Sequence, residues 1–420
     1  MAILKIKSLL MSRRFSIPLF IAVAFLHLLL YWLLGILVVV INRAVLPTQY
    51  AVQFAEDLSW DFSYAQTFLT KPLTLYSYNA QYVSNLQYLP AFMLYDVPWY
   101  LACSSLGPIS FGSSAIYQSM IVYNFSMVVW NLVNCFLIYK IMNTNKVQAM
   151  LGNTVLRNPF ILMSLYMGTS VFYIDYFVGQ DNAVLGFFLL LGIFCYVNDK
   201  EHFTYFFWGI GLWFKTILVI FIVVLILHGP LKRFVKNAAF LALSQVPNAI
   251  LFVVYPSLLT DFFYNVVFRL GSPYILSIPV NMVQFLYQYY NVAISTSYII
   301  IFCSLLPLTA YVFAECKKAM TFFDKMMVLS LLFLNIVQGE PNHVIIMLGV
   351  YLVWIAIKNK DLHDSIRYLK LMLGIPFIGG LLWLIFPYNP LIYFSALIWL
   401  NLAFIFPTKL PLNKIGTLET

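Results

Sequence analysis

The sequence predicts an all-α polytopic membrane protein, and its composition is the first reason. Of the 420 residues, 62% are hydrophobic and only 9% are charged, with a mean hydropathy of +0.88. These values exceed those of soluble domains and are typical of a chain that lies largely in lipid. Long apolar runs between short polar segments are the second reason, because helices satisfy their own backbone hydrogen bonds inside a bilayer.

Hydropathy predicts about twelve membrane segments. The first follows a basic N-terminus, is too long for a cleaved signal peptide and lacks a small-residue cleavage site. The expected segments are 17–41, 115–140, 160–178, 180–198, 203–214, 216–228, 238–258, 293–314, 325–338, 344–358, 370–386 and 390–406.

Two stretches depart from a simple hydropathy pattern. The stretch 86–106 is apolar enough to span but contains Asp96 and two prolines, so we expect an interfacial or re-entrant helix. The stretch 203–227 is interrupted by Lys215, and the basic cluster after it requires an even number of crossings. A short helical hairpin with Lys215 at its tip meets both conditions. A single span, which would invert the downstream half, is the alternative.

Basic residues predict the orientation, because cytoplasmic loops of membrane proteins are enriched in Lys and Arg. With the N-terminus inside, only four of the 24 Lys and Arg residues remain on the outer face: Arg43, Lys71, Lys215 and Arg269. The net charge of +9 therefore reflects orientation, and no basic patch interleaved with stacking aromatics indicates a nucleic-acid partner.

The layout describes a single integral membrane domain, 1–420. Its parts are the first span 17–41, an outer loop 42–114, core helices 115–258, a second outer loop 259–292 and C-terminal helices 293–420. The five cysteines form no CxxC pair, which argues against a disulfide framework or a zinc site.

Polar side chains gather on the outer face of this layout, which is the pattern of one site and not of scattered snorkelling residues. Asp61 lies in the outer loop within Trp60-Asp61-Phe62, and Asp57, one helical turn earlier, is its competitor as the functional carboxylate. Two tight turns carry further candidates, Gly179-Gln180-Asp181-Asn182 and Gly339-Glu340-Pro341-Asn342-His343. Tyrosines such as Tyr64 and Tyr88 crowd the outer loop, as an interfacial belt or as stacking surfaces for a sugar.

The motifs resemble those of a known family. Trp60-Asp61-Phe62, Leu75-Tyr76 and Gln87-Tyr88-Leu89-Pro90 resemble the first-loop pattern of glycosyltransferase family 87, a GT-C fold family that uses polyprenyl-phosphate sugars. The turn Gly179-Gln180-Asp181-Asn182, followed by Lys215 after a glycine-containing run, is similar to that family's later motif. The resemblance covers about residues 57–233. The chain departs from the family's pattern at Leu89, Lys71-Pro72 and Thr216. These departures leave the sugar specificity and the loop geometry open, more than the fold.

The resemblance implies a GT-C fold and the transfer of a hexose, with mannose expected, from a polyprenyl- or dolichyl-phosphate donor to a lipid, glycan or protein-linked acceptor. The transfer would be inverting, with Asp61 as the general base that activates the acceptor hydroxyl. The candidates for binding the donor phosphate are Lys215, Arg269 and His343; those for binding sugar or acceptor are Gln180, Asn182, Tyr64, Tyr88 and Glu340. The family also favours a prokaryotic cell membrane with the site facing outside, the lumen of the endoplasmic reticulum being the alternative.

No cofactor is expected, no metal is demanded, and a metal held by Asp57 and Asp61 is the second choice. Asp57 and Asp61 are four residues apart and do not form the DxD motif of nucleotide-sugar enzymes, and a monophosphate donor needs less divalent assistance than a pyrophosphate. The absence of a glycine-rich phosphate loop in the sequence argues against a soluble nucleotide donor.

Each assignment has an alternative. Lys215 can be a snorkelling lysine near a helix end, and His343 can cap a helix. For the whole chain, the main rival is a polytopic transporter or a lipid-linked sugar flippase without transferase activity. That class would predict inverted repeats and helices broken deep in the bilayer, and no internal repeat is evident in the sequence. A partner subunit without activity, built on the same fold, is a third interpretation.

Overall fold

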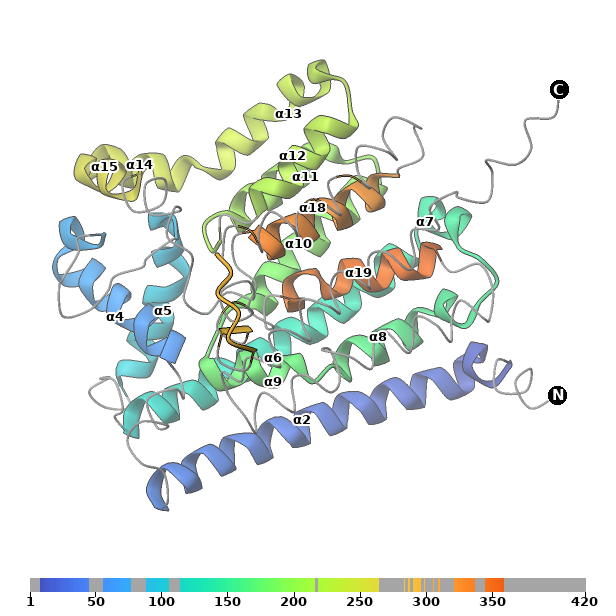
Figure 1. Cartoon of the computed structure of the whole chain (residues 1–420), viewed down its shortest axis with the longest axis horizontal. Helices are drawn as coiled ribbons and strands as arrows, with labels where there is room; N and C mark the ends of the chain where they lie inside the picture. The colour runs from blue at the N-terminus through green and yellow to red at the C-terminus, as the bar shows by residue number, and fades with distance from the viewer. Residues whose placement is uncertain are drawn as a thin grey trace.

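The computed structural model describes residues 8–44, 56–76, 88–105, 114–215, 218–263, 321–336 and 344–358, with short stretches between 283 and 309. Within these residues every regular element is a helix, most of them side by side along one direction (Figure 1). The all-α prediction is therefore confirmed for the described part of the chain.

Two of the described helices are long and apolar enough to cross a bilayer alone. They lie within α2 (Arg13–Ala44) and α6 (Ser114–Met142), and the stretches that qualify are Arg13–Leu33 and Gln118–Met142. α2 lies along the edge of the bundle against α8 (Pro159–Met167) (Figure 1). It exposes large apolar side chains such as Phe25 and Trp32. An exposed apolar stripe of this length is what lipid tails would cover.

A third candidate span is bent. α13 (Leu231–Ser244) and α14 (Val246–Val254) meet at an angle of 53° and pass the test for a span only when they are taken together. Pro247 lies in the first turn of α14, where it lacks an N–H group and its ring would clash with the preceding turn of a continuous helix. The expected span 238–258 is therefore not one straight helix, and α15 (Pro256–Phe263) follows it at the same end.

The expected span 160–178 is also broken. α8 ends at Met167, and α9 (Val171–Val178) begins after three intervening residues. The Met167 carbonyl accepts a hydrogen bond from His27 Nδ1 at 2.8 Å, so the bond comes from α2. Because a carbonyl only accepts, His27 Nε2 is left to accept from the Tyr176 hydroxyl, also at 2.8 Å. α2 thus binds both halves of the broken helix.

The same hydroxyl begins a chain of buried polar contacts across the bundle. Asn131 Nδ2 donates to Tyr176 Oη at 2.8 Å, and Tyr166 Oη donates to Asn131 Oδ1 at 3.1 Å. Asn134 Nδ2 in turn lies 3.0 Å from Tyr166 Oη and 2.9 Å from the Ala183 carbonyl. These bonds join α6, α8, α9 and the first turn of α10 through buried side chains, so they fix the relative register of the four helices.

α10 (Asn182–Val197) lies at the centre of the bundle, against α6, α11 (Glu201–Gly211) and α19 (Val344–Lys358). Trp208 of α11 packs directly on Gly192, where a Cβ atom would lie 2.0 Å from the indole nitrogen. That nitrogen donates to the Leu189 carbonyl at 3.1 Å. The close approach explains why glycine occupies this position of α10.

The expected hairpin around Lys215 is present as two short helices. α11 ends at Gly211 and α12 (Val219–His228) begins at Val219. A Cβ at Gly211 would lie 2.0 Å from Leu218 Cδ1, which shows that the chain turns back on itself between the two helices. Lys215 lies in this connection.

The first outer loop contributes two helices at one end of the bundle. α4 (Glu56–Thr70) is followed by η1 (Pro72–Thr74), and η2 (Pro90–Phe92) leads into α5 (Met93–Ser104). α5 has twelve residues, about 18 Å of helix, which is too short to cross a bilayer. This length agrees with the expected non-spanning helix in 86–106.

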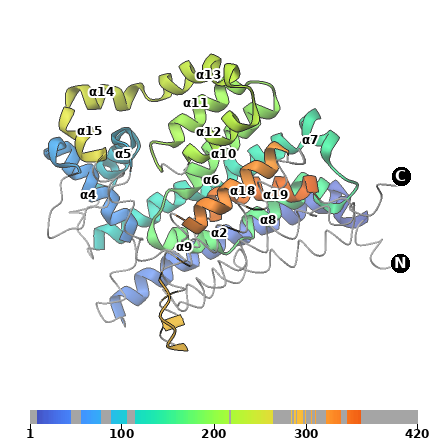
Figure 2. The same cartoon turned by 45° about the horizontal axis from the view of Figure 1, so that its top comes forward.

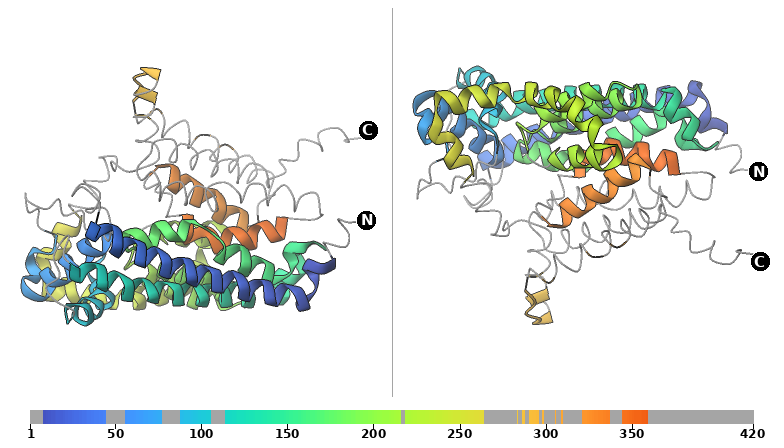
Figure 3. Two further views of the ribbon diagram at one scale, coloured as in Figure 1. Left: turned by 90° about the horizontal axis from the view of Figure 1, so that it is seen from below. Right: turned by 90° about the horizontal axis from the view of Figure 1, so that it is seen from above.

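The bundle therefore has two distinguishable ends (Figure 2). α4, α5, α14 and α15 lie together at one, here named the α4 end; the opposite α7 end holds α7 (Asn145–Met150), η3 (Val155–Arg157) and the start of α2. The two further views separate the same groups of helices (Figure 3). Of the twelve expected segments, only those within α2 and α6 are single helices long enough to span. The remaining segments are short or broken helices or fall outside the described residues, as do 370–386 and 390–406.

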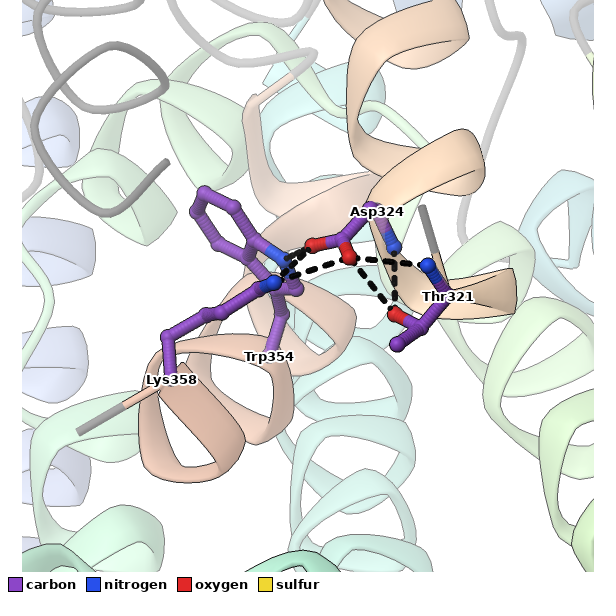
Figure 4. A network of polar contacts seen from close by, with 4 residues as sticks. All are labelled: Thr321, Asp324, Trp354 and Lys358. Atoms are coloured by element: carbon purple, nitrogen blue, oxygen red, sulfur yellow. Dashed lines mark hydrogen bonds and ion pairs between the residues drawn. The ribbon is translucent and has the colours of Figure 1, made fainter. Parts of the chain in front are cut away.

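At the α7 end, α18 (Phe322–Ile336) and α19 are joined through Asp324 (Figure 4). Asp324 Oδ2 accepts from the backbone N–H and the hydroxyl of Thr321, at 2.9 and 2.8 Å, and so caps α18. Trp354 Nε1 donates to Asp324 Oδ1 at 2.8 Å, and Lys358 Nζ lies 2.7 Å from that oxygen. This carboxylate is fully used as a cap and an ion pair, which marks it as structural.

The predicted orientation can be tested at the two ends. In a background without the five native cysteines, we expect Lys71→Cys to react with an impermeant maleimide added to intact cells, and Asn145→Cys to react only after permeabilisation. Both positions are exposed, Lys71 at the α4 end and Asn145 in α7. The reverse labelling pattern would refute the orientation. Asn182 is unsuitable for this purpose because the structure buries it completely.

Candidate functional site

Asp61 lies on the buried face of α4. Leu58, Phe62 and Ala65 share that face at helical spacing, and Asp61 itself is only 4% exposed. The Phe62 ring makes edge contacts with the rings of Tyr100 and Tyr123, so α4 is anchored on α5 and α6. The side chain of Asp57 lies outside the described part of the chain.

The turn between α9 and α10 supports α4. Gly179 ends α9 with a φ of +79°, and its N–H and that of Gln180 donate to the Asp175 carbonyl at 2.9 and 3.1 Å. This left-handed cap is a conformation that glycine adopts without strain. A Cβ atom on Gly179 would lie 2.6 Å from Leu58 Cβ, so the turn touches the helix that carries Asp61 one turn further on.

Lys215 reaches the same turn from the hairpin. Its Nζ donates to Asn182 Oδ1 at 2.9 Å and lies 3.5 Å from Gln180 Oε1. Asn182 Nδ2 donates to Asp175 Oδ1 at 2.7 Å and also to Gln180 Oε1. The two amide oxygens therefore face the ammonium group, and Asp175 fixes the orientation of Asn182.

Two further carboxyl groups belong to this end. Asp96 of α5 and Asp181 of the turn are both buried, each about 1% exposed. Burial first, then the charge of Asp181, raises the pKa of Asp96 well above its usual value. Burial also raises the pKa of Tyr95, and the charges of Asp181, Asp96 and Asp61 add to that effect. The pKa of Tyr95 is therefore affected by carboxyl groups from α4, α5 and the turn, so these three groups lie near one another.

The bend between α13 and α14 ties the first outer loop to the hairpin. Asn248 Oδ1 accepts from the Ala91 N–H at 2.7 Å, and Asn248 Nδ2 donates to Gln245 Oε1 at 2.8 Å. Gln245 Nε2 donates to the Gly209 carbonyl at 2.6 Å. This pair of amides holds η2, just before Asp96, and the end of α11, just before Lys215.

The structure thus brings together Asp61, Gln180, Asn182 and Lys215 at the α4 end, from segments up to 154 positions apart in the chain. Tyr64 and Tyr88 are half-buried and pack against the hydrophobic core, and the Tyr88 carbonyl accepts from the Tyr76 hydroxyl at 2.7 Å. The remaining predicted residues, Arg269, Glu340 and His343, lie outside the described residues.

Sequence reasoning did not assign roles to Asp96, Asp175 and Asp181. Asp96 was used only as an argument against a span in 86–106, although an acidic residue inside an apolar run is itself a signal of a functional site. Asp181 lies in the recognised turn, and Asp175 lies four positions before Gly179, where the turn begins. Among the described residues, no group of three His, Cys, Asp or Glu side chains is arranged to hold a metal ion.

Replacing Gly179 tests the contact between the turn and α4. We expect Gly179→Ala to lower the free energy of unfolding by roughly 1–2 kcal/mol from the left-handed conformation alone, with a further loss from the contact with Leu58. The measurement is thermal unfolding of the purified protein in detergent. Gly229→Ala is the control, because its φ is −121° and the nearest atom to its new Cβ would belong to the flexible Arg233 side chain, at 3.2 Å. Equal melting temperatures for the two variants would contradict the prediction.

Replacing Asn248 tests the link across the bend. Asn248→Leu leaves the buried Ala91 N–H without its acceptor, so we expect a loss of about 1–3 kcal/mol in the free energy of unfolding. We also expect faster proteolysis near η2. Asn143→Leu is the matched control, because Asn143 is exposed and bonds only to the carbonyl of Tyr139 in its own helix. If the two variants unfold and are cleaved alike, the link does not hold η2.

The chain was compared with known families, curated proteins and solved structures, and none of them matches it. A function must therefore be argued from the motifs in the sequence and from the geometry of the α4 end.

Proposed function

We propose that this protein is a membrane glycosyltransferase that moves a hexose from a polyprenyl-phosphate donor to a lipid or glycan acceptor at the outer face. One observation carries the proposal. The helix of Asp61 rests on the turn that binds Lys215, so a buried carboxylate and a fixed cation belong to one end of the bundle.

The chemistry of such a transfer fits this pair. A sugar on a lipid phosphate already has a good leaving group, so an inverting transfer needs one base for the acceptor hydroxyl and positive charge for the departing phosphate. In the proposed mechanism the Asp61 carboxylate accepts the proton of the acceptor hydroxyl. The hydroxyl oxygen then bonds to the anomeric carbon while the bond from that carbon to the phosphate oxygen breaks.

Lys215 is the described cation best placed for the phosphate. Asn182 and Gln180 present their amide oxygens to its ammonium group, which orders a flexible side chain before substrate arrives. The N-terminus of α10 begins at Asn182, and its partial positive charge favours an anion at the same place. Arg269 and His343 complete the proposed phosphate site, and Glu340 with the tyrosines Tyr64 and Tyr88 completes the sugar and acceptor site.

The proposal extends to the fold and location. About twelve membrane segments in a GT-C arrangement, with the α4 end facing the outside of a prokaryotic cell, would put the site at the lipid surface where the donor is found. The distribution of described basic residues supports this orientation, since the start of α2, η3 and the end of α19 carry Arg or Lys at the α7 end.

A transporter or flippase for a lipid-linked sugar is the second candidate. The break between α8 and α9 and the 53° bend after α13 favour it, because transporters build substrate sites at interrupted helices. It predicts protein-dependent movement of a labelled lipid-phosphate sugar across proteoliposomes with no new glycosidic product. The transferase predicts the product in detergent, where no transbilayer movement exists.

The base assignment is tested with the purified protein, polyprenyl-phosphate mannose or glucose, and membrane lipid extract as acceptor. We expect Asp61→Asn to reduce the transfer rate by about 10²- to 10⁴-fold, because the amide cannot accept the proton. Lys215→Met should also slow transfer, whereas Asp199→Asn and Lys236→Met, both at exposed positions away from the site, should not. Transfer near the wild-type rate by a folded Asp61→Asn protein would exclude Asp61 as the base.

A further inference from the structure

Asp96 is a buried acidic residue with an unpaired carboxyl oxygen in the described part of the chain. It lies in the first turn of α5, is 1% exposed, and its Oδ2 atom has no hydrogen-bond partner within the described part of the chain. A buried carboxyl oxygen without a partner is strongly disfavoured, and in native proteins it usually marks the place of a ligand or an ordered solvent molecule.

Among the described residues, no cation contributes to the environment of Asp96. α5 packs against α4, α6 and η2, and the titratable groups around Asp96 and its neighbour Tyr95 are Asp181 of the turn, Asp61 of α4, Tyr123 of α6 and Cys103 of the same helix. The ion pairs Lys146–Asp199, Arg233–Glu201 and Lys358–Asp324 lie elsewhere, and Lys215 is directed to Asn182 and Gln180.

Two buried carboxyl groups that interact closely do not both ionise without a compensating charge. The burial of Asp96 and the charge of Asp181 both raise the pKa of Asp96, so its protonated form is favoured. A neutral carboxylic acid has one O–H donor, which the ionised form lacks. The α4 end, which also carries the proposed base, therefore offers a donor.

We propose that Asp96 is a substrate-binding carboxylic acid of this site, which donates its proton in a hydrogen bond to a hydroxyl oxygen of the sugar or of the acceptor. This inference rests on the proposed function for the nature of the ligand. It assigns different states to the two acids, an ionised Asp61 that accepts a proton and a neutral Asp96 that donates a hydrogen bond.

Infrared spectroscopy of the purified protein tests the protonation without any transfer reaction. At pH 7 we expect the spectrum of the wild-type protein to contain a carbonyl band of a protonated carboxyl group, and Asp96→Asn to remove it. Asp199→Asn, an exposed position at the α7 end, is the matched control and should leave the band unchanged. If Asp96→Asn removes no such band, the proposal is wrong, whether or not the protein is a transferase.

Addition of the two substrates identifies the ligand. A shift of the Asp96 band on adding polyprenyl-phosphate mannose or glucose alone would assign the hydrogen bond to the donor sugar, and a shift with lipid extract alone would assign it to the acceptor. A band that neither addition shifts would contradict substrate binding by Asp96.

Kinetics give a second test that separates this role from that of Asp61. Asp96→Asn keeps a neutral donor of similar shape, so we expect kcat within about threefold of wild type. Asp96→Leu removes the donor, and we expect KM for the bound substrate to rise by roughly tenfold with a smaller change in kcat, as for one lost hydrogen bond. An inactive but folded Asp96→Asn protein would instead show that the ionised carboxylate is required.

Stability against pH provides a readout for folding. The folded state holds the Asp96 proton above pH about 4, where the unfolded chain releases it, so rising pH favours unfolding of the wild-type protein. We therefore expect the melting temperature of Asp96→Asn, relative to wild type, to increase as the pH rises from 4 to 7. A constant difference over that range would contradict a protonated Asp96.

Discussion

The turn Gly179–Asn182 is the contact on which the α4 end depends. Gly179 of this turn packs against Leu58 of α4, and the side chains of Gln180 and Asn182 bind Lys215. The charge of Asp181 raises the pKa of Asp96 and that of Tyr95. The left-handed conformation of Gly179 allows α9 to end and α10 to begin within three residues. If the turn moved, three segments distant in sequence would lose their common support.

The turn is held in place by polar bonds inside an apolar bundle. The break after Met167 would leave backbone groups without hydrogen-bond partners, and His27 from α2 is the partner of the Met167 carbonyl. The surrounding helices are connected by hydrogen bonds among His27, Tyr176, Asn131, Tyr166 and Asn134. In a low-dielectric interior such bonds are strong when they are complete, and an incomplete network is strongly disfavoured. The interrupted helix is therefore a defined structure, and it determines where the turn faces.

The charges at the two ends of the bundle serve different purposes. At the α7 end, Asp324 is saturated by Thr321, Trp354 and Lys358, so its carboxylate caps one helix and binds another. At the α4 end, Asp96 is buried with an oxygen that has no partner among the described residues, and its neighbours are acidic. A saturated carboxylate stabilises the fold, whereas an unsaturated one retains the capacity to bind a substrate.

The sequence by itself determined the helical class, the two long helices α2 and α6, the short non-spanning helix of 93–104 and the hairpin that contains Lys215. Hydropathy and charge determine these features because they act locally along the chain. It also singled out Asp61, Gln180, Asn182 and Lys215, but not their proximity. Only the tertiary structure decided that these residues lie at one end of the bundle, that the expected spans 160–178 and 238–258 are interrupted, and that Asp96 is a buried part of the same end. The physical reason is that breaks and burial depend on partners such as His27, Gln245 and Asp181, which contact each segment from elsewhere in the chain.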